Sequence, residues 1–104
     1  MVKNAINYLD DRIQDDYNYL KRYYKKEEDL KKNHLSNIAI HYLYGRSFFK
    51  DIPVSKRSKE AYDYFMEQSE KYWLSQGLYS KGMMALYLSR YDKSQVAADI
   101  TKSL

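Results

Sequence analysis

The feature that most restricts the fold of this chain is a stripe of apolar residues along its first 24 positions. Apolar side chains recur there at spacings of three and four, the repeat of an α-helix that buries one face. The stripe continues for about six turns without a proline or glycine. Its members are Val2, Ile6, Leu9, Ile13, Tyr17, Leu20 and Tyr24. The pattern therefore predicts a long amphipathic helix that packs along one side.

The rest of the chain predicts four more helices. Three glycines and one proline are too few for the many tight turns of an all-β fold. Pro53 interrupts the helical pattern within a linker over 50–58. The predicted helices span 34–49, 59–76, 78–91 and the stretch from Asp92 onward. We predict an all-α fold with about five helices in antiparallel hairpins, one helical domain over 1–104 that forms part of an α/α toroid or an α-solenoid.

Several residues are suited to the ends of these helices. Asn33 is expected to cap the second helix and Ser58 the third, because their side chains can accept backbone N–H bonds. Gly77 is expected to end the third helix in the left-handed conformation. Residues 92–95 have the spacing of a capping box, with the aspartate as the cap. Gly82 lies inside a mostly apolar helix and predicts a close helix contact.

Tyrosine dominates the aromatic residues, at 13 against three phenylalanines and one tryptophan. Because a buried tyrosine keeps its hydroxyl near water or a partner, a thin core close to the surface is expected. A hydrophobic fraction of 44% with 31% charged residues is typical of a folded chain. No apolar run approaches the ~20 residues that span a bilayer. Acidic residues follow the first residues too soon for a signal peptide.

The first predicted helix contains four aspartates, a composition also found in aspartate-rich Mg²⁺ sites. Hard cations such as Mg²⁺ need several carboxylates in one place. Helical geometry puts Asp11 and Asp15 on the side away from Ile13, and Asp10 and Asp16 at the two edges of the stripe. The four side chains are therefore expected not to converge, and a solvated face is the favoured interpretation.

The positions of the two histidines and the absence of cysteine also argue against a metal-binding or catalytic site. His34 and His41 are seven residues apart, about 10 Å along a helix, which is too far to share one metal. The absence of cysteine excludes disulfides, thiolate metal sites and cysteine nucleophiles in this chain. No phosphate loop or Ser/His/Asp arrangement is present. We therefore expect that the chain is not an enzyme and binds no cofactor. We also expect that none of its residues is catalytic, cofactor-binding or metal-binding.

A run over 20–32 interleaves basic residues with tyrosines, a pattern found in proteins that bind single-stranded nucleic acid. Its six basic residues are accompanied by three acidic ones, and a mixed run of this kind is usually a solvated surface. The net charge of +4 is spread along the whole chain. We therefore expect no nucleic-acid partner.

Three stretches carry a resemblance to a known family: 33–53, 61–104 and the opening 5–17. They resemble the helical region of large bacterial α2-macroglobulin-like proteins of the type common in Bacteroidetes. In that family this region belongs to an α/α toroid called the thioester domain. The resemblance covers essentially the whole chain, but it rests on helix sequences rather than on a reactive motif. The Cys-x-Glu-Gln thioester of some members has no counterpart in this chain, which has no cysteine.

The resemblance implies a non-enzymatic structural segment of a protease-trapping or protease-inhibiting protein of the cell envelope. Its partners would be the neighbouring domains of the parent, with proteases as the parent's targets. The parent would be exported, to the periplasm or to an outer-membrane anchor. The alternative is a free-standing helical-hairpin adaptor, similar to tetratricopeptide proteins, that binds a peptide in a concave groove. A long parent reading frame with a signal peptide favours the first, and a short cytosolic one favours the second.

The last helix stops at Leu104 on its own apolar stripe, with no residue suited to end it. Under the resemblance the chain would be a fragment of a larger domain, and the helix would continue into further helices of the toroid. Val96, Ile100 and Leu104 would then form an exposed apolar face. A homodimer that covers this face is the expected oligomer.

Overall fold

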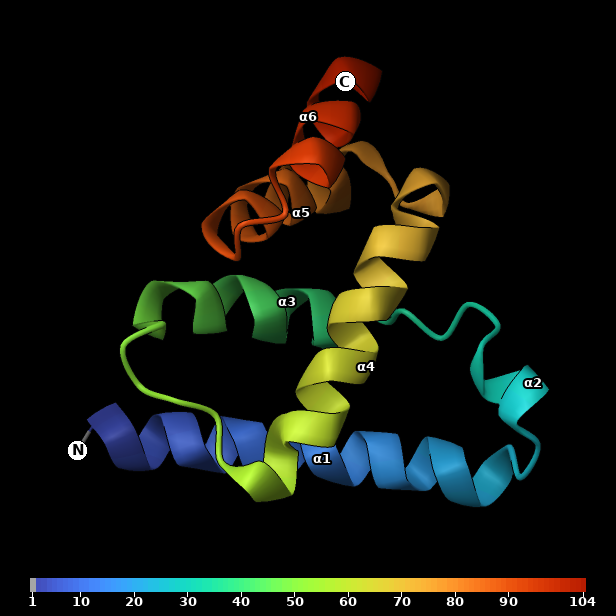
Figure 1. The fold of residues 1–104 in the computed structure, drawn as a ribbon, viewed down its shortest axis with the longest axis vertical. Coiled ribbons are helices and arrows are strands. Elements are labelled where there is room, and N and C mark those ends of the chain that lie inside the picture. Colours follow the sequence, from blue (N-terminus) through green and yellow to red (C-terminus); the bar gives the residue numbers. More distant parts are fainter. Residues whose placement is uncertain (1) are drawn as a thin grey trace.

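Six α-helices and two 3₁₀ turns make up residues 2–104 of the computed structural model, and this part of the chain contains no strand (Figure 1). The side chains described are those of residues 4–104. The elements are α1 (Val2–Tyr23), α2 (Glu27–Leu30), α3 (Asn37–Arg46), η1 (Ser47–Phe49), α4 (Lys56–Tyr72), η2 (Trp73–Ser75), α5 (Leu78–Arg90) and α6 (Ser94–Ser103). The all-α prediction is confirmed. The prediction does not include the single turn α2. The toroid or solenoid arrangement stays a prediction.

The helices form a flat slab that measures 37 × 35 × 19 Å. Its thickness is about two helix diameters. In Figure 1, α1 and α3 run alongside each other, and α4 crosses both of them. α5 packs against α3 and α6, whereas α1 packs mainly on α4, which is distant in sequence. Gln14 of α1 forms a hydrogen bond to α4, because its Oε1 accepts the Ala61 N–H at 3.2 Å.

The core is thin and contains tyrosine, as the composition predicts. Tyr87 is fully buried, and its hydroxyl lies 2.7 Å from the Ser69 Oγ. The α1 stripe contributes Ile6, Ile13 and Tyr17 to the interior. Leu9, which the stripe predicts to be buried with them, is 46% exposed. It lies on the edge of the stripe, where the slab offers no further layer to cover it.

Two of the predicted helix starts are wrong. α3 begins at Asn37, where the Ser36 Oγ accepts the Ala39 N–H at 3.1 Å. Asn33 instead accepts the Leu35 N–H within the preceding loop. α4 begins at Lys56, before the expected cap Ser58. Ser58 therefore lies inside the first turn of α4, fully buried, and its hydroxyl has no hydrogen-bond partner among the described residues.

The predictions for two glycines are also wrong. Gly77 has an extended backbone, φ −72° and ψ 171°, and precedes α5 rather than ending α4. The chain has already left the α-helical geometry at η2, so no left-handed residue is needed there. Gly82 makes no close contact with the described residues of other helices, since a Cβ atom built on it would meet nothing within 4 Å.

Asp92 ends α5 instead of capping α6. It has a left-handed backbone with φ 63°. The Lys93 N–H bonds the Leu88 carbonyl at 2.8 Å, and the Asp92 N–H bonds the Ser89 carbonyl at 3.2 Å. These two bonds are those of a Schellman motif, which usually has glycine at the left-handed position. The side chain of Asp92 does not cap α6, whose first residue is preceded by Lys93.

Asp92→Gly is therefore expected to raise the free energy of unfolding by about 0.5–1 kcal/mol. Glycine adopts the left-handed conformation without the steric cost that a side chain brings. Asp92→Ala should lower the stability by a similar amount, because alanine lacks the local hydrogen bonding that makes Asp tolerable there. Urea unfolding of the two variants checks this order, and an Asp92→Gly protein less stable than Asp92→Ala would contradict the assignment.

The homodimer predicted through Val96, Ile100 and Leu104 is not supported by the structure. Ile100 is fully buried and Val96 is partly buried, which leaves only Leu104 of the three well exposed. The reason is that α6 turns its apolar stripe onto α5.

No helix among residues 2–104 is sufficiently long and apolar to cross a bilayer.

Candidate functional site

An open groove of about 480 Å³ lies between α1 and α3. Its walls are mostly apolar: Leu9 and Ile13 come from α1, and Ile38 and Tyr42 come from α3. Leu9 is half-exposed, and Ile38 is exposed over two thirds of its surface, at 66%. Gly45 also lines the groove and leaves space beside it, because a Cβ atom there would meet nothing within 4 Å. The groove thus presents apolar side chains to solvent along two neighbouring helices.

The rim of the groove carries both signs of charge. Arg12 and Asp16 lie one turn apart on α1 and line the groove. Neither makes an ion pair with another side chain of residues 4–104. The Arg12 Nη1 donates a long hydrogen bond to the Tyr8 hydroxyl, at 3.4 Å. This bond, and then the charge of Asp16, raise the pKa of Arg12, so the guanidinium stays charged.

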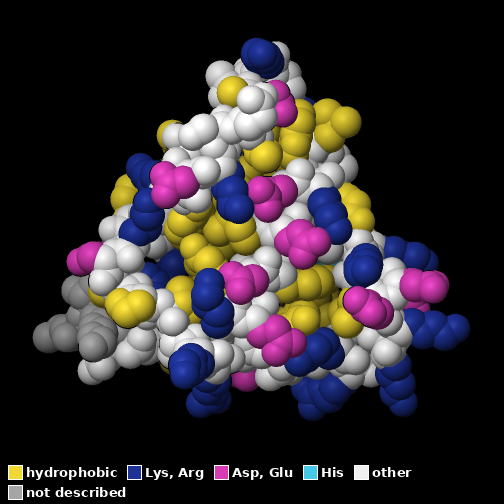
Figure 2. All heavy atoms as spheres, in the orientation of Figure 1, with side chains coloured by type: hydrophobic (Ala, Val, Ile, Leu, Met, Phe, Trp, Pro, Cys, Tyr) yellow, Lys and Arg dark blue, Asp and Glu magenta, His cyan; other side chains and the backbone are white. Residues whose placement is uncertain are grey.

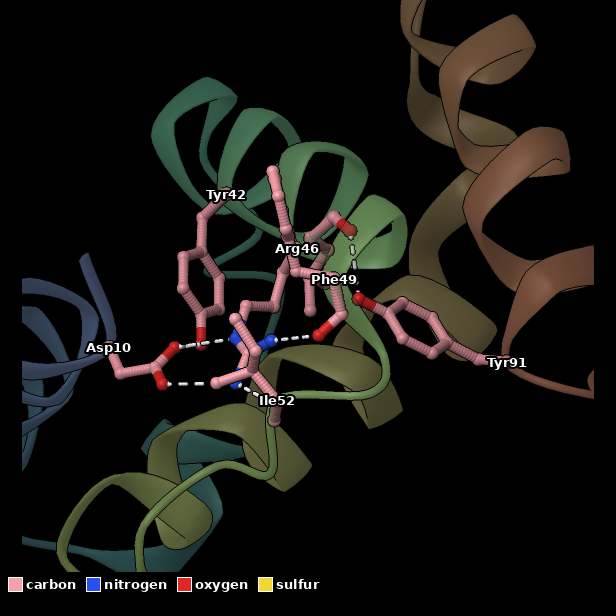
Figure 3. A network of polar contacts seen from close by, with 7 residues as sticks. Asp10, Tyr42, Arg46, Phe49, Ile52 and Tyr91 are labelled. Carbon is pink, nitrogen blue, oxygen red and sulfur yellow. Dashed lines mark hydrogen bonds and ion pairs between the residues drawn. The ribbon is translucent and has the colours of Figure 1, made fainter. Parts of the chain in front are cut away.

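A buried ion pair holds α1 and α3 together beside the groove (Figure 3). Asp10 of α1 and Arg46 of α3 are 1% and 3% exposed, and the Arg46 Nε lies 3.0 Å from the Asp10 Oδ1. The same carboxylate oxygen accepts the Tyr42 hydroxyl at 2.5 Å. The remaining Arg46 donors bond the Phe49 and Ile52 carbonyls, both at 2.6 Å. Burial and the bond to Asp10 raise the pKa of Tyr42 well above its usual range.

This buried cluster has the features of a structural element. The Asp10 carboxylate is fully engaged by Tyr42 and Arg46. Arg46 in turn fixes the loop after η1 through two carbonyl groups. Groups that are buried and mutually satisfied in this way have no free position for a substrate. Asp10, expected at an edge of the stripe, is instead buried because Arg46 neutralises it.

The other candidate metal ligands do not come together. Asp11 lies 3.9 Å from the Arg57 Nε, and Asp15 is exposed. The His34 Nε2 lies 2.6 Å from the Asp29 carbonyl, and the His41 Nδ1 lies 2.7 Å from the Asn37 carbonyl. Within the part of the chain that the structure describes, no three His, Asp or Glu side chains could hold one metal ion.

The basic and aromatic run after α1 is compensated locally. Lys31 pairs with Glu27 at 3.6 Å, and Lys32 pairs with Asp29 at 3.4 Å. On the face shown in Figure 2, Lys and Arg side chains alternate with Asp and Glu. The mixed charges on this face differ from the continuous basic stripe that tracks a phosphate backbone.

Sequence reasoning missed the groove, although a second pattern on α1 indicates it. Residues on the solvent side of α1 also recur at spacings of three and four. We call them the outer stripe: Ala5, Tyr8, Leu9, Arg12, Asp16, Tyr19 and Tyr23. Three of them are tyrosines between 60% and 69% exposed. A helix with apolar residues on a second, exposed side is typical of a surface that binds a partner.

No match was found when the chain was compared with protein-family models, with curated proteins and with solved structures. The functional inference therefore rests on the groove, its rim and the outer stripe.

Proposed function

We propose that this chain is a non-enzymatic protein-interaction module, and that the groove between α1 and α3 binds an amphipathic α-helix. The observation that supports this proposal is the exposure of Leu9 and Ile38 on facing walls of one groove. Helices bind in such grooves by inserting apolar side chains spaced at three, four and seven residues. Exposed apolar surface with a polar rim is a common mark of an interaction site.

The charged rim of the groove sets which charges the bound helix must carry. Arg12 would pair with an acidic residue of the bound helix, and Asp16 would pair with a basic residue one turn away. Pairs at the rim contribute little affinity in water, but they fix the direction in which a helix lies. The bound helix is therefore expected to carry two opposite charges beside its apolar stripe.

A place in the α/α toroid of a bacterial α2-macroglobulin-like protein is a second proposal. What supports it is the resemblance of 33–53 and 61–104 to that family, together with an apolar groove of the kind that a neighbouring helix fills. The bound helix would then belong to an adjoining domain of an exported protease inhibitor. A parent reading frame that is long and has a signal peptide is the expected result, and a short frame without one would contradict this placement.

Ile38→Glu is expected to weaken helix binding by at least about tenfold, because it places a charge in the apolar wall. The probe is a synthetic amphipathic helix of leucine, lysine and glutamate, titrated against isotope-labelled protein and followed by NMR. Shifts should gather on α3 and on the solvent side of α1. Leu86→Glu is the matched control, since Leu86 is similarly exposed on α5 and should leave binding unchanged.

Ile38 is exposed, so the variant should remain folded, which circular dichroism checks. Shifts that fall elsewhere, or an affinity that is the same in the Ile38→Glu and wild-type proteins, would refute the groove as the binding site.

A further inference from the structure

Six of the seven residues of the outer stripe, all except Tyr8, form three pairs at equal distances on either side of position 14. The centre of the stripe holds Arg12 and Asp16, which lie at equal distances from position 14. Leu9 and Tyr19 come next on the two sides, and both are large and apolar. Ala5 and Tyr23 come last, one small and the other large. At 100° per residue these six positions lie within a band about 80° wide on the helix surface, so one partner helix can contact them all.

An antiparallel second copy of α1 would match six of the seven positions of this stripe, and Tyr8 would lie opposite Leu20. Arg12 would face Asp16 of the second copy, and the two-fold axis would repeat the same pair on its other side. Leu9 would face Tyr19, and the small Ala5 would face the large Tyr23. A parallel copy would instead bring Arg12 against Arg12 and Asp16 against Asp16, which costs free energy through repulsion. The charges thus select the antiparallel direction.

The groove beside α1 has room for the side chains that such a copy brings. It is lined by Leu9, Arg12 and Asp16, which belong to the outer stripe. Ile38 and His41 of α3 form its far wall. A second, smaller hollow of about 220 Å³ continues along α1 past Asp16 to Tyr19 and Leu20. The recess therefore follows the middle of α1, where the facing side chains of a second helix would lie.

We infer that the helix bound in the groove is α1 of a second copy of this chain, in an antiparallel dimer with its two-fold axis at the level of residue 14. This inference rests on the proposed function and names its partner. With the axis at residue 14, residues 5–23 of α1 lie opposite the same residues of the second copy, so the contact is about 28 Å long. A single helix pair of this length is typical of a weak dimer, with a dissociation constant in the micromolar range.

The exposed apolar residues of α5 are a weaker candidate for the dimer contact than the outer stripe of α1. Leu78, Tyr79 and Leu86 are at least half exposed, but the charged residues of α5 are Lys81 and Arg90. With no acidic residue on that helix, two copies of it would bring like charges together. The self-complementary pattern belongs to α1.

The test is a charge exchange followed by analytical ultracentrifugation. Wild-type protein should be a dimer at hundreds of micromolar. Arg12→Glu and Asp16→Lys should each weaken the dimer by at least about a hundredfold, because each places two like-charge pairs at the centre. An equimolar mixture of the two variants should dimerise again, since each copy then faces opposite charges. The double variant Arg12→Glu/Asp16→Lys should dimerise alone. Both positions are exposed or partly exposed, and the new residues favour helix, so folding should persist.

A wild-type protein that stays monomeric at hundreds of micromolar overturns the inference. So does a dimer that the single charge variants leave intact, or a mixture that fails to restore association. The proposed function has a separate readout, because the peptide titration with Ile38→Glu, run below the concentration at which the chain dimerises, reports on the groove alone.

Discussion

Replacing Asp10 with alanine is expected to lower the free energy of unfolding by about 3–5 kcal/mol. The change leaves the Arg46 guanidinium, which is 3% exposed, with a buried charge and no carboxylate beside it. Removing one partner of a buried ion pair has a cost of this size. The Tyr42 hydroxyl also loses its acceptor. For a domain whose total stability is about 5–15 kcal/mol, the loss is a large fraction.

Urea unfolding measures this effect, and two further proteins give it context. Lys21→Ala removes the exposed pair with Glu60, whose side chains are 38% and 57% exposed, and should cost less than about 1 kcal/mol. Asp10→Leu combined with Arg46→Met should recover part of the loss, because it removes both buried charges. The recovery is partial because the Tyr42 hydroxyl and the two carbonyls that Arg46 bonds still lose their hydrogen-bond partners. An Asp10→Ala protein within about 1 kcal/mol of the wild type would show that the pair is not buried as described.

The helices could be predicted from the sequence because their signal is local. The α1 stripe has the 3.6-residue repeat of a buried face, and Ile6, Ile13 and Tyr17 are buried. Asp10 could not be placed in the same way. Its burial depends on Arg46, 36 residues later in the chain, and on Tyr42 between them. No local pattern contains that partner.

The predictions of the helix ends were wrong for a related reason. Ser36, Asn33 and Ser58 are all residue types that cap helices, so the residue type alone does not choose among nearby candidates. The left-handed Asp92 has the sequence signal of a helix start because the same residue type serves both at caps and at left-handed positions. Which role applies depends on where α5 stops, and packing against α6 and α3 decides that.

The groove escaped prediction because the apolar stripe of α1 assigns Leu9 to the core. In a slab two helices thick, an apolar residue at the edge of a stripe has no third layer to bury it. The sequence shows which residues are apolar, but the number of layers decides which of them are covered. The outer stripe is visible in the sequence, yet its meaning depends on knowing that α1 lies at the surface with one side open.

Raising the pH above 10 is expected to unfold the protein, because several of its tyrosines are buried or partly buried. Burial is the main cause that raises the pKa of Tyr42, Tyr64, Tyr87 and Tyr91 far above their usual range. In the unfolded chain each hydroxyl ionises near pH 10. Since the folded pKa is the higher one, the stability is fully present below about pH 10 and falls as the pH rises above it. Each site costs about 1.4 kcal/mol per pH unit in that range.

Four such sites together exceed a stability of about 5–15 kcal/mol within one to three pH units above 10. Exposed tyrosines such as Tyr19 and Tyr79 can ionise without unfolding, because their hydroxyls reach water in the folded protein. The remaining tyrosinate absorbance, followed on the same samples as the helicity, should therefore appear together with the loss of helix in one cooperative step. Tyr87→Phe removes one of the four sites and should make the stability fall less steeply with pH. Tyr79→Phe, at an exposed position, is the control that should leave the slope unchanged. If the tyrosinate absorbance rises gradually to its full value while helicity persists, the hydroxyls of Tyr42, Tyr64, Tyr87 and Tyr91 reach water in the folded state.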